Sequence, residues 1–375
     1  MFLRTFGWSF AITIVGLIAA GLLWGAEGFG IVLILSVLEI SLSFDNAVVN
    51  ATVLKRMNPY WQKIFLTVGV LIAVFGMRLI FPLLVVGLTA HLNPATVIDL
   101  ALHSDQTYNG STYAQYLEAA NPAIAAFGGI FLLMIFLDFI FEEKDFNWLS
   151  WIEKPLEKVG KLDAFSSVIS LIVLALAANF FAGENAETVL LAGIMGLATY
   201  LAVNGLSSVF EAGLELDEDE DEEAEGSAEV AGKGGKSIVQ VGGKAAFFLF
   251  LYLEVLDASF SFDGVVGAFA ITQDIFMITL GLGIGAMYIR SLTVFLVRKG
   301  TLDDYVYLEH GAHYAIGALA VILLVGIEYH IPEIVTGLIG VAFIGLALGS
   351  SILRNRREHP AGGGEPELVG SESKQ

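Results

Sequence analysis

Apolar blocks, each close to 20 residues long, recur from the beginning of the sequence almost to its end. A helix needs roughly 20 mostly apolar residues to cross the hydrocarbon core of a bilayer. The chain is 56% hydrophobic and 15% charged, with a mean hydropathy of +0.73. A soluble protein is closer to about half apolar and about a quarter charged. The blocks therefore predict an all-α, polytopic membrane helix bundle.

The blocks predict about ten transmembrane helices. They are expected near residues 8–26, 30–53, 63–90, 123–141, 164–182, 186–210, 245–270, 275–297, 313–330 and 333–353. The first block follows Arg4 as a signal peptide would, but no clean cleavage site follows it, so we expect a retained helix.

Lysine and arginine occupy every second loop between these blocks. Lys55 and Arg56 follow the second block, whereas Thr89 to Pro122, after the third, contains no base. Loops rich in lysine and arginine remain cytoplasmic. The alternation therefore predicts an even number of spans in a multi-pass membrane protein with both termini in the cytoplasm.

Much of the formal net charge of −20 lies in one run, Glu211–Glu225. This run reads as part of a disordered cytoplasmic linker, although it could also concentrate cations at a cytoplasmic mouth. The acidic balance argues against nucleic-acid binding. The chain has no cysteine, so a metal site would use oxygen and imidazole ligands.

Composition divides the chain into seven expected parts. They are an N-terminal transmembrane helix (1–29), a first membrane repeat (30–141), connecting transmembrane helices (142–210), an acidic disordered linker (211–244), a second, inverted membrane repeat (245–331), a last transmembrane helix (332–354) and a disordered tail (355–375).

Two apolar blocks contain the same polar motif. EISLSFDNAV at residues 39–48 matches DASFSFDGVV at residues 257–266, with a constant offset of 218 positions. Each motif helix is followed by a helix with one arginine, Arg78 or Arg290. The loop charges orient the two motif helices in opposite directions. Inverted repeats with matching polar motifs are typical of secondary transporters, whose substrate site lies near the midplane.

The motif acids are expensive in a membrane, at about 2.5–3.5 kcal/mol each near a helix centre. We expect them to face the bundle interior, where carboxylate, hydroxyl and amide oxygens suit Mg²⁺, Ca²⁺ or Mn²⁺. The candidate metal ligands are Glu39, Asp45, Asn46, Glu254, Asp257 and Asp263, and the supporting polar or ion-pair residues are Ser43, Ser261, Arg78 and Arg290. A purely internal network of arginines and carboxylates is the alternative.

Helical spacing places Glu39, Ser43 and Asn46 on one face, whereas Asp45 lies about 120° away round a straight helix. Either the motif helices unwind near Ser43 and Ser261, or the two acids of each motif serve different neighbours. Which acid pairs with an arginine and which binds an ion stays open.

Other polar residues carry weaker signals. His310 and His313 are spaced for a metal site but also suit an ordinary polar helix start. Asp138 and Glu328 are either pathway acids or interfacial anchors. The sequence contains no nucleophile–base–orienter set and no phosphate-binding loop, so we do not expect an enzyme or a bound cofactor.

From about Gly30 to Arg354, the paired motifs EISLSFDN and LDASFSFD, each followed by a helix with one arginine, resemble the TerC/Alx family of bacterial membrane proteins. The likeness is closest to an uncharacterised, domain-of-unknown-function branch. The resemblance implies an inner-membrane protein of tellurite resistance or manganese export, in which Glu39, Asp45, Asn46, Asp257 and Asp263 handle the metal. The two motifs are not equivalent, because the second has Gly264 where the first has Asn46 and so lacks that potential ligand.

These observations lead to two functional hypotheses. The first is a secondary transporter of a divalent cation, most plausibly Mn²⁺ export, with the lipid bilayer and the cation as partners. The second is a non-transporting membrane protein that supports metal-ion resistance or the metalation and assembly of secreted proteins.

Overall fold

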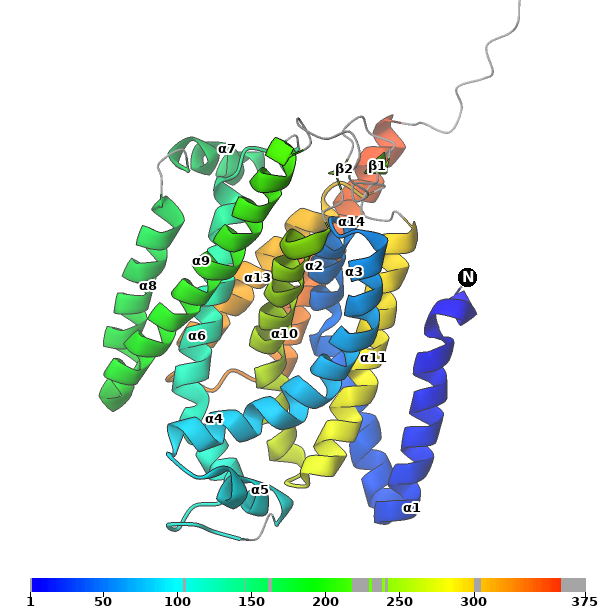
Figure 1. The fold of residues 1–375 in the computed structure, drawn as a ribbon, viewed down its shortest axis with the longest axis vertical. Coiled ribbons are helices and arrows are strands. Elements are labelled where there is room, and N and C mark those ends of the chain that lie inside the picture. The colour runs from blue at the N-terminus through cyan, green and yellow to red at the C-terminus, as the bar shows by residue number, and fades with distance from the viewer. Residues whose placement is uncertain are drawn as a thin grey trace, which may run out of the picture.

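The computed structural model of the chain describes residues 2–103, 106–144, 146–160, 164–217, 229–230, 238–239, 242–299 and 305–358. These residues form a bundle of long helices that run up and down in Figure 1. Seven helical stretches are long and apolar enough to cross a membrane: Thr5–Ile40, Ile72–Thr89, Tyr113–Phe141, Gly183–Gly205, Ile275–Val297, Leu308–Val325 and Val335–Arg357. The predicted helical membrane bundle is therefore confirmed.

The helices of the first half are α1 (Phe2–Leu42), α2 (Phe44–Lys55), α3 (Pro59–Ile64), the π-helical turns η1 (Phe65–Gly69) and η2 (Ile72–Ile80), α4 (Phe81–Thr89), α5 (Pro94–Leu102), α6 (Tyr113–Phe141), α7 (Ser150–Val159), α8 (Phe165–Phe181), the 3₁₀ turn η3 (Gly183–Asn185) and α9 (Ala186–Asp217). The second half contains α10 (Gly243–Ile271), α11 (Ile275–Lys299), α13 (Leu308–Val325) and α14 (Glu333–Glu358). The strands β1 (Glu229–Val230) and β2 (Ile238–Val239) pair antiparallel.

The element α1 is two membrane helices joined at Gly25. Gly25 has φ +72° and ψ −162°, a backbone conformation that is essentially restricted to glycine. The chain reverses there, and Figure 1 shows the two arms of α1 side by side. This turn separates the first two expected spans.

The two motif helices run in opposite directions. In Figure 1, α2 ends at the upper face, where α3 begins, whereas α10 starts at that face and descends to α11. Each of the ten expected spans lies largely on helical residues, although the second is interrupted at Ser43 and α13 ends at Val325, earlier than residue 330. The expected disordered linker begins with helix, since α9 continues to Asp217, and most of its remainder lies outside the described residues, as does the tail from residue 359.

Helix α6 begins at Tyr113, earlier than the expected start near residue 123. Thr112 and Gln115 form a capping box, in which each side chain accepts a hydrogen bond from the other residue's backbone. Pro122 then lies inside the helix rather than at its start. Proline is tolerated within membrane helices because neighbouring groups compensate for the missing N–H donor.

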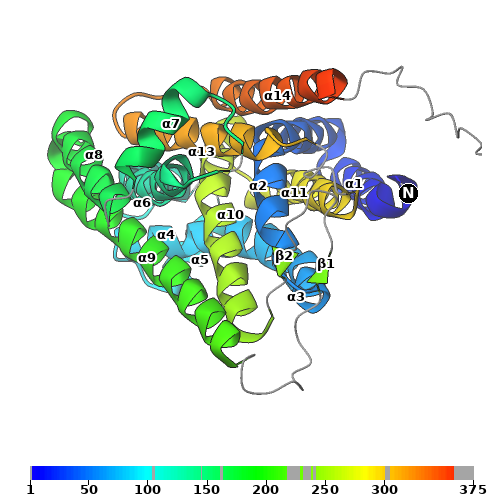
Figure 2. The same cartoon turned by 90° about the horizontal axis from the view of Figure 1, so that it is seen from above.

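The main core surrounds α6, which packs against α8, α9, α10 and α13. Ile130, Phe131 and Leu132 are fully buried, so this helix is covered on all sides rather than on one stripe. Figure 2 shows α2 on the other side of α10, close to α11 and α13. This arrangement brings the two motif helices together in the middle of the bundle.

Candidate cation site

A stripe of buried polar side chains follows the first motif helix across the bundle. Glu39, Ser43, Asn46 and Asn50 are at most 6% exposed. Their spacing of i, i+4, i+7 and i+11 places them on one helical face, in agreement with the expected common face of the first three. The stripe crosses a break, because Ser43 separates α1 from α2 with a non-helical ψ of 16°.

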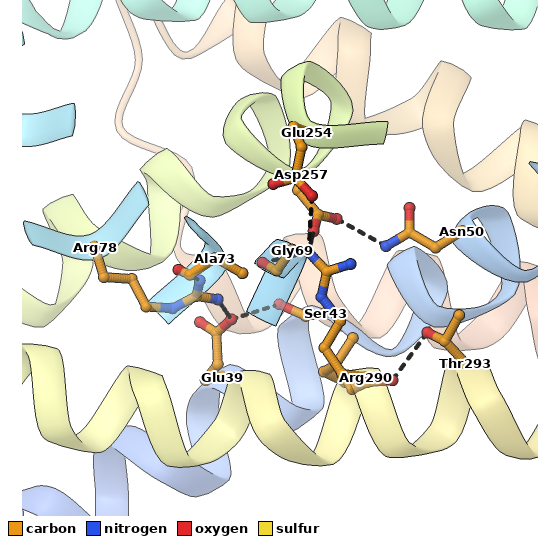
Figure 3. Close-up of polar contacts among 11 residues, drawn as sticks. Glu39, Ser43, Asn50, Gly69, Ala73, Arg78, Glu254, Asp257, Arg290 and Thr293 are labelled. Atoms are coloured by element: carbon orange, nitrogen blue, oxygen red, sulfur yellow. Dashed lines mark hydrogen bonds and ion pairs between the residues drawn. The ribbon is translucent and has the colours of Figure 1, made fainter. Parts of the chain in front are cut away.

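Glu39 forms a buried ion pair with Arg78 of η2 (Figure 3). Ser43 Oγ donates a second hydrogen bond to Glu39 Oε1 over 3.0 Å. The Arg78 guanidinium also donates to the carbonyl oxygen of Ala73. The charge of Glu39 is therefore offset by one arginine within the first repeat.

Asp257 occupies the corresponding place in the second repeat and pairs with Arg290 of α11. The distance from Arg290 Nη2 to Asp257 Oδ2 is 2.5 Å. Arg290 Nη2 also lies 3.3 Å from the carbonyl oxygen of Gly69, and the guanidinium lies 3.8 Å from the centre of the Phe65 ring. Because Gly69 and Phe65 belong to the first repeat, this arginine joins the two halves.

Two of the motif acids are seen to hold the arginines. The first acid of each motif, Glu39 or Asp257, pairs with the arginine of the following helix. The two motif helices differ in their continuity. The first is broken at Ser43, whereas α10 continues without interruption through Ser261.

The described carbonyl groups that contact Arg78 and Arg290 lie in π-helical turns. Gly69 ends η1, and Ala73 belongs to η2. Such turns have a different hydrogen-bond register from an α-helix and occur frequently at functional sites. Here they present backbone oxygens to the guanidinium groups from a helix that would otherwise be apolar.

Glu254 adds a third buried carboxylate. It is 5% exposed, and Oε1 lies 3.7 Å from Arg290 Nη2. Neither carboxylate oxygen has a hydrogen-bond partner among the described residues. When all three described carboxylates are ionised, they share two arginines, and one negative charge is in excess in a region where charge is expensive.

A cavity of about 90 Å³ reaches the first motif from the side of the α13–α14 loop, which follows the lower end of α13 in Figure 1. Its inner wall includes Glu39, Ser43, Asn46 and Gly264, and its outer wall includes His330 of the α13–α14 loop. A narrow void of about 20 Å³ shares Glu39, Ser43 and Asn46 with it and continues to the residues Arg78, Asp257 and Arg290. Polar groups of both repeats therefore line one route into the bundle.

Two glycines of the second repeat make room for Glu39. A Cβ atom at Gly264 would lie 3.2 Å from Glu39 Oε2, and one at Gly285 would lie 2.4 Å from Glu39 Cβ. The replacement of asparagine by Gly264 in the second motif thus has a steric reason, since that position faces the carboxylate of the first motif.

The side chains of Asp45, Asp263 and Ser261 lie outside the described residues, although their backbones belong to α2 and α10. In the part that is described, no group of three or more histidines and acids lies close enough to hold a metal ion. The ligand roles of Glu39, Asp45, Asn46, Glu254, Asp257 and Asp263 therefore stay predictions.

The sequence reading did not single out Asn50, which donates a hydrogen bond of 2.8 Å to Asp257 Oδ1. An extension of the i, i+4, i+7 pattern by one turn would have found it. Asp138 and Glu328 have different surroundings. Asp138 accepts a hydrogen bond of 2.5 Å from Tyr200, whereas Glu328 is exposed after the end of α13.

A family model matches residues 44–358, a span that contains Arg78, Arg290 and almost the whole of both repeats. The chain belongs to the DUF475 family. The description of DUF475 is "Protein of unknown function". No curated protein and no solved structure matches the chain. The DUF475 span begins inside the first motif, after Glu39, and includes the entire second motif.

Proposed function

We propose that this DUF475 protein is a secondary transporter of a divalent metal cation, with Mn²⁺ export as the favoured activity. The observation that carries the proposal is the meeting of two antiparallel motif helices around buried carboxylates. When ionised, Glu39, Glu254 and Asp257 carry one more charge than Arg78 and Arg290 offset. A cation is the simplest partner for that excess charge.

Two further features support a transport route. The cavity that ends at Glu39 gives access from one face, and α1 is discontinuous with α2 at Ser43. Discontinuous helices near the midplane of inverted repeats build the ion sites of known secondary transporters. In this proposal Asp45 and Asp263 complete the site, and the chain lies in a bacterial inner membrane with both termini in the cytoplasm, as the TerC/Alx resemblance suggests.

A second function is favoured by the arginine pairs. Glu39 and Asp257 are each held by a guanidinium, as expected for an internal network that joins helices. The alternative is therefore a non-transporting membrane protein that supports metal-ion resistance or the metalation and assembly of secreted proteins.

Flux into proteoliposomes distinguishes the two functions. Full-length protein is reconstituted and assayed with Mn²⁺, Mg²⁺ and Ca²⁺, each with and without a pH gradient, and protein-free liposomes are the control. We expect protein-dependent Mn²⁺ movement that responds to the gradient. Absence of flux for all three ions, together with unchanged cellular Mn²⁺ in a deletion strain, would remove the transport proposal.

A further inference from the structure

A second polar cavity lies on the side of the basic loops, among helix ends that are at the upper face of Figure 1. It has a volume of about 240 Å³ and lies between the ends of α2, α6, α9, α10 and α13. An adjoining cavity of about 330 Å³ shares Phe139, Glu142 and Glu309 with it. We call the two together the α6–α13 vestibule.

The charges of this vestibule are unequal. Four carboxylates line it, against two basic side chains and two histidines. The carboxylates are Asp138, Glu142, Glu143 and Glu309, and the basic residues are Arg56 and Lys144. With neutral imidazoles the lining carries two negative charges in excess, which matches the charge of a divalent cation.

Local contacts fix the walls of the vestibule. Tyr200 donates to Asp138 Oδ2 over 2.5 Å and itself accepts a bond of 3.4 Å from Asn204. His313 stacks on Phe139 with ring centres 3.8 Å apart, and its Nδ1 contacts the carbonyl oxygen of Glu309 over 2.9 Å. The carboxylates therefore project from a wall that is held in place by its neighbours.

His310 supplies an independent sign of a missing ligand. Its side chain lines the outer part of the vestibule and is only 5% exposed. Neither ring nitrogen has a hydrogen-bond partner among the described residues, and the carboxylate of Glu153 is 3.6 Å from Nε2. Buried polar groups in proteins are normally satisfied, by water or a ligand where the protein offers no partner.

The described residues contain no group of three or more histidines and acids that could ligate a bare ion directly. The volume suits a cation that keeps its water, since one water needs only about 10–15 Å³ of such space. Burial raises the pKa of the Glu142 carboxyl, with Glu309 among the contributors, and a nearby cation would offset that cost of ionisation.

We propose that the α6–α13 vestibule binds a hydrated divalent cation between Glu142 and Glu309. The imidazole of His310, whose ring nitrogens have no hydrogen-bond partner among the described residues, lies beside it. Glu142 and Glu309 are the two acids shared by both parts of the vestibule. This inference deepens the proposed function, because it names where the cation meets the chain on the side of the basic loops. Binding at this place does not itself require transport.

The vestibule leads toward the central site along α2. Thr52 and Val53 line its inner end, and Asn50, which contacts Asp257, lies less than one turn before them. One helix thus carries polar lining residues from the lower cavity, through the arginine pairs, to the vestibule. The vestibule shares no lining residue with the cavities at Glu39, so a cation in the vestibule is separate from one at Glu39.

Because the chain contains no cysteine, Thr52→Cys introduces a single reporter in the vestibule. In sealed vesicles, we expect a membrane-impermeant maleimide to label it only from the side of the basic loops. Mn²⁺ alone should slow this labelling at least fivefold, whereas K⁺ at equal ionic strength should not. Labelling that does not change with Mn²⁺ would overturn the inference.

Matched variants identify the ligands. In the Thr52→Cys background, Glu142→Gln/Glu309→Gln should abolish the protection by Mn²⁺. Glu187→Gln, the same change at an exposed site in the first turn of α9, should retain it. His310→Gln tests the imidazole separately and should reduce the protection. Equal protection in the double variant and in Glu187→Gln contradicts the proposal.

A direct measurement of bound Mn²⁺ completes the test. Electron paramagnetic resonance of free Mn²⁺ counts the ions bound by full-length protein in lipid nanodiscs. The acid run Glu211–Glu225 also attracts cations, so the difference between variants isolates the vestibule. We expect Glu142→Gln/Glu309→Gln to weaken one site at least tenfold. Wild-type vesicles that show protection without flux would retain this inference and reject the transporter.

Discussion

Asn50 and Asp257 connect the two repeats through a hydrogen bond of 2.8 Å between residues 207 positions apart. The Asn50 amide donates to Oδ1, while Arg290 contacts Oδ2 of the same carboxylate. Each oxygen of Asp257 is thereby matched to a donor from a different helix. The contact makes the second acidic motif dependent on the first repeat.

Loss of the Asn50 amide should therefore destabilise the protein. We expect Asn50→Ala to lower the free energy of unfolding by about 1–2 kcal/mol. The buried carboxylate of Asp257 loses a hydrogen-bond donor, and no water inside the bilayer replaces it. Unfolding by SDS titration measures the change. The matched control is Asn204→Ala, whose amide contact of 3.4 Å is weaker and joins neutral groups. Equal effects of the two changes would contradict this account of Asn50.

The Glu39–Arg78 pair should behave as a unit. Arg78→Met leaves a carboxylate uncompensated in the bundle, and we expect a loss of about 3–5 kcal/mol. The double variant Glu39→Gln/Arg78→Met removes both charges, so it should be more stable than Arg78→Met alone. Thermal unfolding of all four proteins completes the double-mutant cycle. Additive effects would show that the two side chains do not interact.

The close approach of Gly285 to Glu39 predicts a graded series of alanine variants. Gly285→Ala should cost about 1–3 kcal/mol, because its Cβ would lie 2.4 Å from Glu39 Cβ and force α1 and α11 apart. Gly264→Ala should cost less, since only the end of the Glu39 side chain must move. Gly345→Ala, with nothing within 4 Å, is the control. A different order, measured by SDS unfolding, would be inconsistent with the packing.

The second acids of the motifs are the most direct functional test. We expect Asp45→Asn and Asp263→Asn each to abolish Mn²⁺ flux into proteoliposomes, because each change removes a charge that would offset the cation. Asparagine is similar in size to aspartate, so the amount of protein in the membrane should remain unchanged. Glu187→Gln is again the control. Normal flux in both aspartate variants would remove these acids from the mechanism.

The helix arrangement was predictable because the bilayer imposes it. A span needs about 20 apolar residues, and basic loops orient the chain, so the apolar blocks and the lysines led to the antiparallel motif helices. Helix ends were less predictable. The start of α6 depends on a local capping box at Thr112, and Pro122, which looked like a boundary, is accommodated inside the helix.

The polar residues of the site were found from their cost in a membrane, but their partners were not. Spacing alone did not decide whether Glu39 or Asp45 holds an arginine, because that depends on how neighbouring helices pack. The carbonyl contacts of Gly69 and Ala73 could not be predicted from the sequence either, because they depend on π-helical turns. Such turns reflect tertiary packing rather than a local sequence signal.

The break at Ser43 has a mechanical consequence for the repeat. One copy of the motif is divided at Ser43, whereas the other copy lies within the unbroken rod of α10. Bending a continuous helix requires the distortion of several consecutive backbone hydrogen bonds, whereas a joint already present requires fewer. Bending of this membrane domain is thus easiest at Ser43, in the first of the two motifs. The two motifs are similar in sequence, but the first would bend at Ser43 while the second stays rigid within α10.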